Sequence, residues 1–212
     1  MATMAPLTEA ERNMLAEVRR LLGDNLAGFL LSGLGETGIT HRRTFIAQSI
    51  PSHGDKITYQ FEMANDSELG LPIGRDPLVL VALLDLLLER QPLDSRVLFK
   101  DSHVLEKLGW PQSMDAQLLV KQALERYFLT AYCLIDPTAE EGRRILGRYA
   151  GLRRLLIGYE TTSVMLPVKR TESNGLTKVQ FLPEFFYDVL SEKKYFLGVE
   201  FQGLGEIQQI SS

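Results

Sequence analysis

Residues 97–135 carry the pattern that most constrains the fold: a short strand, a helix, a tight turn, a second helix and a strand. Gly109 follows the first helix at the position where a left-handed residue commonly ends a helix. Residues 110–112 form the turn, and Ser113 caps a second helix that we expect to reach about Leu129. This order predicts a helix–turn–helix that leads into the first strand of a wing.

The second helix of such a unit commonly lies in the major groove of DNA. Within residues 114–129, Leu118, Leu124 and Phe128 are expected to face the core. The other side of the helix would then carry the polar and basic side chains Gln117, Lys121, Gln122 and Arg126. Such side chains can bond base edges and phosphates. A solvated helix face carries the same residue types, so the pattern alone leaves both interpretations open.

A basic cluster follows the strand expected over residues 130–135. Its members are Arg143, Arg144, Arg148, Arg153 and Arg154, with no Asp or Glu between the first and the last. The whole chain has a net charge of −4, which argues against simple non-specific binding of nucleic acid. The cluster therefore fits either a specific DNA contact or an acidic protein partner.

The remaining segments predict further helices and short strands. A helix is expected over residues 7–31, where Thr8 and Glu11 form a capping box, and residues 42–50 and 56–64 alternate as two strands of a hairpin. Later elements are a helix over residues 76–89, strands over 152–164 and 178–182, a helix over 184–194 and a strand over 195–201. The sequence thus predicts an α+β fold, a winged helix-turn-helix with a small antiparallel sheet in residues 67–212 and an N-terminal helix and β-hairpin extension in residues 1–66.

No motif in the chain indicates catalysis, a metal site or a cofactor. His41, His53 and His103 lie far apart, and no paired His or Cys ligands, nucleophile elbow or phosphate-binding loop is present. We therefore expect a protein that is not an enzyme. The single cysteine fits a reducing compartment. Without an export signal or an apolar run long enough to span a bilayer, we expect a cytoplasmic protein without a membrane partner.

Three sequence motifs follow one another between residues 70 and 201. The first is Gly70-Leu71-Pro72 followed by Asp76 and the apolar run VLVALL at residues 79–84; the second is VKQALER at residues 120–126 followed by Thr130; the third is FLPEFFY at residues 181–187. Together they resemble the replication initiator protein A family of bacterial plasmids.

Members of that family are built from winged-helix domains, bind repeated sequences at the plasmid origin and recruit host replication proteins. The resemblance implies that the protein binds double-stranded DNA at origin repeats. It implies a homodimer as well, because the first domain of such initiators often dimerises. The implied DNA-binding residues are Ser113, Gln117, Lys121, Gln122, Arg126, Arg143, Arg144, Arg148, Arg153 and Arg154. The alternatives are a winged-helix module for protein interaction or dimerisation, and a transcription regulator that uses the same surface.

Overall fold

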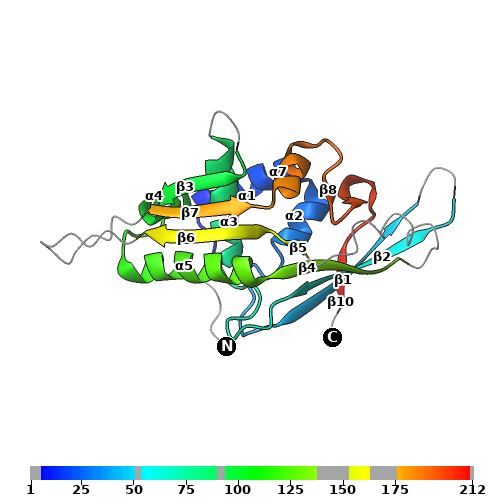
Figure 1. The fold of residues 1–212 in the computed structure, drawn as a ribbon, viewed down its shortest axis with the longest axis horizontal. Coiled ribbons are helices and arrows are strands. Elements are labelled where there is room, and N and C mark those ends of the chain that lie inside the picture. Colours follow the sequence, from blue (N-terminus) through cyan, green and yellow to red (C-terminus); the bar gives the residue numbers. More distant parts are fainter. Residues whose placement is uncertain (1–5, 51–53, 90–93, 138–152, 163–175, 211–212) are drawn as a thin grey trace, which may run out of the picture.

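The computed structural model describes residues 6–50, 54–89, 94–137, 153–162 and 176–210. Within these residues the protein has a mixed α/β fold in which helices pack against antiparallel sheets (Figure 1). One buried apolar cluster runs through all the layers. Each described helix is too short or too polar to cross a lipid bilayer.

A three-stranded sheet and three helices form one part of the molecule (Figure 1). The elements follow each other as α3 (Asp76–Leu88), β3 (Arg96–Lys100), α4 (Asp101–Leu108), α5 (Met114–Leu129), β6 (Leu156–Thr162) and β7 (Leu176–Phe181). The strands pair in the order β3-β7-β6, so the first strand lies beside the last. Helix α5 contacts α3, α4 and β6, and it therefore forms the border between the helices and the sheet.

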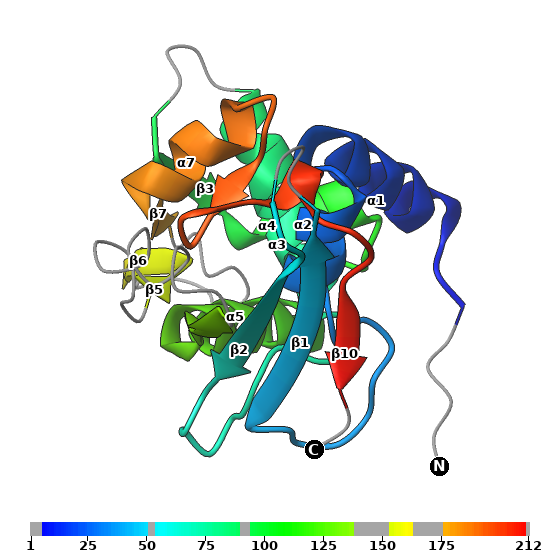
Figure 2. The ribbon, with the colours of Figure 1, turned by 90° about the vertical axis from the view of Figure 1, so that its right-hand side faces the viewer.

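The second sheet joins strands from distant parts of the chain. Its strands are β1 (Arg42–Ser49), β2 (Ile57–Ala64), β4 (Ala131–Pro137), β5 (Arg153–Arg154) and β10 (Gln208–Ile210), in the order β10-β1-β2-β4-β5. Figure 2 shows β2, β1 and β10 side by side. The hairpin of the N-terminal extension is thus continuous with strands from the rest of the chain.

The position of β4 corrects one prediction. The strand that follows α5 pairs with β2 and β5, and not with β6 or β7 as the first strand of a wing would. The hairpin beside α5 is made instead by β6 and β7. A periodic apolar pattern gives the existence of a strand but not its partner, because pairing between distant strands depends on tertiary contacts.

The N-terminal segment forms two helices rather than the single helix expected over residues 7–31. Helix α1 (Glu9–Leu22) starts at the predicted capping box, in which the Thr8 side chain accepts from the Glu11 N–H and the Glu11 carboxylate accepts from the Thr8 N–H. It ends at Gly23, whose positive φ of 76° breaks the helix, and α2 (Asp24–Leu30) follows at once.

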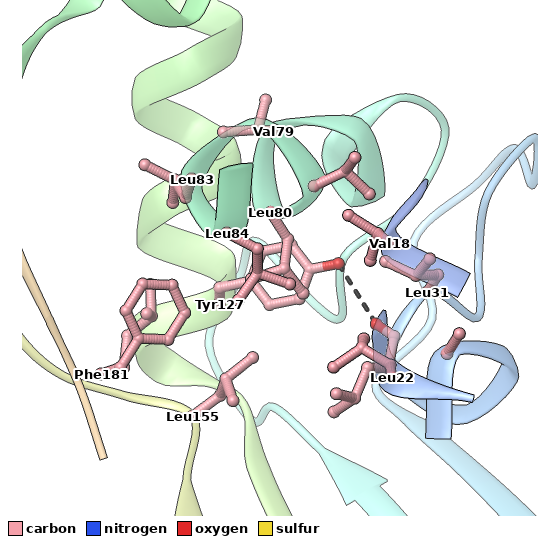
Figure 3. Close-up of a cluster of buried hydrophobic side chains, with 14 of the residues drawn as sticks. Val18, Leu22, Leu31, Val79, Leu80, Leu83, Leu84, Tyr127, Leu155 and Phe181 are labelled. Carbon is pink, nitrogen blue, oxygen red and sulfur yellow. Dashed lines mark hydrogen bonds between the residues drawn. The ribbon is translucent and has the colours of Figure 1, made fainter. Parts of the chain in front are cut away.

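The core is centred on α3, whose side chains are apolar almost all round and nearly all buried. Figure 3 shows Leu80 and Leu84 of this helix against Tyr127 of α5, with Val18 and Leu22 of α1 nearby. The Tyr127 hydroxyl donates to the Leu30 carbonyl at 3.4 Å, which ties α5 to α2. Full burial raises the pKa of this tyrosine well above its usual value.

The C-terminal segment closes the fold over the N-terminal helices and the five-stranded sheet. It contains α7 (Pro183–Leu190), β8 (Tyr195–Phe196), β9 (Val199–Glu200), a 3-10 turn η1 (Phe201–Gly203) and then β10. Phe185, Phe186 and Val189 of α7 are buried, whereas Leu190 is exposed.

Candidate nucleic-acid interface

The helix–turn–helix is formed by α4 and α5, and its local signals lie where the sequence predicts them. Gly109 takes the left-handed conformation with φ 65°, and the Trp110 N–H donates to the Leu105 carbonyl at 2.8 Å. Ser113 caps α5, where its hydroxyl accepts from the Ala116 N–H at 3.2 Å. Both caps are confirmed. Ser113, one of the predicted DNA-binding residues, has this structural role.

A buried carboxylate from the first helix fixes the turn between α4 and α5. The Trp110 indole N–H donates to Glu11 at 2.8 Å, and Arg75 lies 3.2 Å from the same carboxylate oxygen. Glu11 is fully buried, so its contacts with Trp110 and Arg75 hold the turn in place away from water. The sequence indicated only a capping role for Glu11, because nothing local signals a contact between residues 99 positions apart.

The inner face of α5 differs from the predicted one. The buried residues are Ala116, Val120, Ala123, Leu124 and Tyr127. Leu124 is therefore confirmed as a core residue, and Phe128 packs against the core in a partly buried position. The prediction that Leu118 faces the core is wrong, since 54% of this residue is exposed.

Arg126 occupies the place of a core residue rather than of a surface contact. Its guanidinium lies 2.9 Å from Asp76 and donates to the Leu69 carbonyl at 3.1 Å, and only 16% of its side chain is exposed. Burial raises the pKa of Asp76, while the Ile73 N–H and the Arg126 guanidinium oppose that rise. The placement of Arg126 on the outer side with Lys121 is thus corrected: its donors are used inside the fold.

The three other predicted polar residues of α5 are half-buried. The Lys121 ammonium lies 3.9 Å from Asp101, whose other oxygen accepts from the Thr177 hydroxyl at 3.0 Å. The Lys121 side chain is 37% exposed beside Asp101, the first residue of α4. Gln117 lies one helical turn before Lys121, whereas Gln122 lies about 100° further round the helix. The structure therefore brings Gln117 and Lys121 to one flank and places Gln122 on another.

Of the predicted arginine cluster, Arg153 and Arg154 lie within the described residues, where they form β5 at the end of α5. Arg143, Arg144 and Arg148 lie outside them. The exposed Arg154 guanidinium sits 5.8 Å from the centre of the Phe128 ring. Arg153 points to the other side of the sheet, where it lines a pocket of about 360 Å³ together with Glu184, Asp188 and Tyr195. The two arginines therefore serve different surfaces.

The outer side of α5 carries residues that the sequence analysis did not single out. Met114, Leu118 and Leu119 are 73%, 54% and 50% exposed, and Asp115 and Glu125 are exposed beside them. We call these five residues the outer face of α5. The spacing of Met114 and Leu118, one helical turn apart, was a usable signal, but apolar residues on a helix are ordinarily assigned to the core.

Comparison with known proteins gives a likeness in fold alone. No family model matches the chain, and no curated protein matches it in sequence. A crystal structure of selenomethionine derivatives of domains 2 and 3 of RctB superposes with a TM-score of 0.54 at 18% identity, covering 79% of this chain and 62% of that one. A second crystal structure of the same domains gives a TM-score of 0.49 at 17% identity, covering 78% and 60%. The chain thus spans less than two thirds of the RctB chains that it matches, and its fold is similar to that of RctB domains 2 and 3.

Proposed function

We propose that the protein binds double-stranded DNA in the manner of a replication initiator, through a winged helix formed by α3 to β7. The DNA would be the repeated sequence of a replication origin, and host replication proteins would be further partners, as the resemblance to plasmid initiators implies. The likeness in fold to domains 2 and 3 of RctB is compatible with this proposal. The proposed role is that of a binding protein and not of an enzyme.

The observation that carries this proposal is the arrangement around α5. A capped helix–turn–helix is followed by an antiparallel hairpin, β6–β7, whose first strand contacts α5. The second helix of a helix–turn–helix commonly enters a major groove, and the neighbouring hairpin would then lie beside the DNA backbone. Residues 163–175, which join the two strands in the sequence, lie outside the described residues.

The DNA contacts would come from the Gln117–Lys121 flank of α5 and from the arginine cluster. Gln117 and Lys121 lie on that flank, and Gln122 is the remaining polar side chain of the helix for base or phosphate contacts. Arg154 is the exposed arginine at the end of the helix, and Arg143, Arg144 and Arg148 complete the proposed set. We leave Arg126 out because its donors are bonded to Asp76 and Leu69.

The test is the affinity of the purified chain for duplex DNA at two salt concentrations. Random duplexes and duplexes with origin-like repeats are titrated and followed by fluorescence anisotropy. We expect salt-dependent binding that prefers the repeats. Lys121→Ala should weaken it, and the loss of one phosphate contact at Arg154 should lower the slope of log affinity against log salt by about one. Lys193→Ala, an exposed lysine of the C-terminal segment, is the control. No binding of any duplex at low salt would overturn the proposal.

A second candidate function is interaction with protein. The specific observation in its favour is the outer face of α5, which presents three apolar and two acidic side chains where a DNA-reading helix needs donors and cations. The two candidate functions use neighbouring positions of one helix, because Lys121 lies one turn before Glu125.

A further inference from the structure

A pocket of about 360 Å³ lies between α7, β8 and β5, away from the helix–turn–helix. Figure 1 shows α7 beside β8, and the two elements are in contact. The walls of the pocket combine three charged side chains, Arg153, Glu184 and Asp188, with aromatic and aliphatic ones. Sites for small molecules have volumes of about 300–1,000 Å³ and set a few charged groups in a largely apolar wall. The pocket therefore has the size and the lining of a small-molecule site.

The register of the five-stranded sheet brings Arg153 to this pocket. Arg153 of β5 pairs with Tyr132 of β4, so their side chains lie on the same face of the sheet. The Tyr132 ring packs against Phe196 of β8, with 5.7 Å between the ring centres, and Phe196 lines the pocket. Arg154 sits instead beside the Phe128 ring of α5. Arg153 is thus kept at the pocket and is not among the proposed DNA contacts.

The charged groups of the pocket are held apart. Glu184 and Asp188 lie one turn apart on α7, so their carboxylates share one flank of that helix. Arg153 comes from a different element, β5. Among the described residues, none of the three takes part in an ion pair. The lining therefore offers a ligand one guanidinium and two carboxylates, with the negative charge in excess.

The surroundings of Asp188 disfavour its ionised form. Burial, followed by the charge of Glu184, raises the pKa of Asp188 to about 6. A cation bound beside the two carboxylates would oppose both effects, because an opposite charge favours the ionised form. The Tyr195 ring is available to the same cation: its hydroxyl donates to Glu200 at 3.2 Å, which fixes the ring at the pocket wall, and the face of such a ring attracts cations.

The turn that closes the pocket has an unfavourable backbone conformation. Leu197 and Gly198 join β8 to β9 with φ values of 52° and 77°, and both line the pocket. Lys194, the residue before β8, also has a φ of 52°. Leu197 and Lys194 are the two non-glycine residues with positive φ in the described part of the chain, and they flank the same strand. Backbone strain of this kind is concentrated at ligand sites. Backbone and charge therefore mark the same pocket independently.

We propose that this pocket binds a free amino acid with a cationic side chain. The guanidinium of Arg153 would hold the ligand's carboxylate, which it can meet with two parallel N–H donors. The ligand's ammonium groups would lie against Glu184 and Asp188, and its aliphatic chain along Tyr195. A basic amino acid carries one positive charge in excess, which complements the lining. The inference does not depend on the proposed DNA binding, because none of these residues belongs to the proposed DNA contacts.

The probe is L-lysine, titrated into the DNA-free full chain by isothermal titration calorimetry. Two analogues each lack one kind of charge: 1,5-diaminopentane has no carboxylate, and hexanoate has no ammonium group. We expect both analogues to bind about tenfold more weakly than L-lysine, or more weakly still, because each leaves one side of the pocket without its partner. A wild-type protein that does not bind L-lysine at about 10 mM would overturn the proposal. So would equal affinities for L-lysine and 1,5-diaminopentane.

Two variants locate the two ends of the ligand. Arg153→Gln should weaken L-lysine binding about tenfold and leave 1,5-diaminopentane unaffected, because the diamine has no group for Arg153. Asp188→Asn should weaken both ligands, since both carry ammonium groups. The matched controls are Arg154→Gln and Asp115→Asn, the same changes at exposed residues elsewhere, and they should leave both affinities unchanged.

Circular dichroism of each variant establishes that it is folded. An Arg153→Gln variant that loses affinity equally for L-lysine and 1,5-diaminopentane would overturn the assignment of Arg153 to the carboxylate. An Asp188→Asn variant that binds L-lysine as tightly as the wild type would remove Asp188 from the site and overturn the proposal. Because no DNA is present, none of these results bears on the proposed DNA binding.

Discussion

Two residues of α5, Arg126 and Leu118, have exposures opposite to those expected of their residue types. The long cationic side chain of Arg126 lies inside, with 16% of it exposed, and the aliphatic side chain of Leu118 lies outside, with 54% exposed. Both residues belong to one regular helix, so the difference does not come from local structure. It comes from what each side chain meets.

Arg126 is buried because the fold supplies partners for its donors. Asp76 at the start of α3 and the Leu69 carbonyl accept from it, and the Arg126 carbonyl in turn accepts from the Thr130 hydroxyl at 2.7 Å. A buried charge persists only with such partners. Leu118, in contrast, keeps more than half of its surface exposed within the described chain. The comparison teaches that the partner, not the residue type, decides which side of a helix is the inside.

The largest effect is expected from removing the buried guanidinium. Arg126→Ala leaves Asp76 buried without its cation and the Leu69 carbonyl without its donor. We expect the free energy of unfolding to fall by about 3 kcal/mol or more, measured by urea denaturation. Arg154→Ala removes an exposed arginine, and we expect it to change stability by about 0.5 kcal/mol or less. An Arg126→Ala variant that kept wild-type stability but lost DNA affinity would place Arg126 on the outside after all.

The next largest effect is a difference in stability between alanine variants of two leucines on the same helix. Leu124→Ala empties a fully buried position, and we expect it to lower the free energy of unfolding by about 2–4 kcal/mol. Leu118→Ala makes the same chemical change at an exposed position, where we expect about 0.5 kcal/mol or less at concentrations that keep the protein monomeric. Chemical denaturation of the two variants side by side gives the difference. Equal losses would mean that Leu118 is covered within the monomer.

The smallest effect is a pH dependence of stability that we expect from Asp188. Among the described residues, this carboxylate forms no ion pair like that of Asp76 with Arg126. Asp188 of α7 lines the pocket with Glu184, Tyr195 and Arg153, and burial, followed by the charge of Glu184, raises its pKa from 3.8 to about 6. As the pH rises between these two values, the carboxyl ionises in the unfolded chain before it does in the folded protein, so stability falls.

Asp188→Asn removes this loss, because an amide does not ionise. We expect the melting temperatures of the variant and the wild type to diverge as the pH rises from about 4 to 7, with the variant the more stable. Thermal unfolding at several pH values measures this. A constant difference between the two proteins across that range would mean that Asp188 titrates as an ordinary surface carboxyl.

The parts of the fold that the sequence predicts are those with short-range causes. The caps at Thr8, Gly109 and Ser113 each depend on hydrogen bonds to residues only a few positions away, and all three are where the pattern places them. The apolar run of α3 is also a local signal. It leaves the helix without a polar face for water, which predicts a central, buried helix. The helix–turn–helix could therefore be predicted in outline from its own residues.

The candidate site was predicted less well because its surface depends on distant partners. Asp76 and Arg126 are 50 positions apart, and Glu11 and Trp110 are 99 apart. Strand β4 pairs with β2 across a similar distance, which removed it from the predicted wing. Hydrogen-bond caps and periodicity act within a turn or two of helix, so the sequence by itself determined most of the helices and the caps at which they begin, but not the start of α2 or the strand β10. Only the tertiary structure decided which faces are buried, which cations are free and which strands pair, because those depend on chain segments that meet after folding.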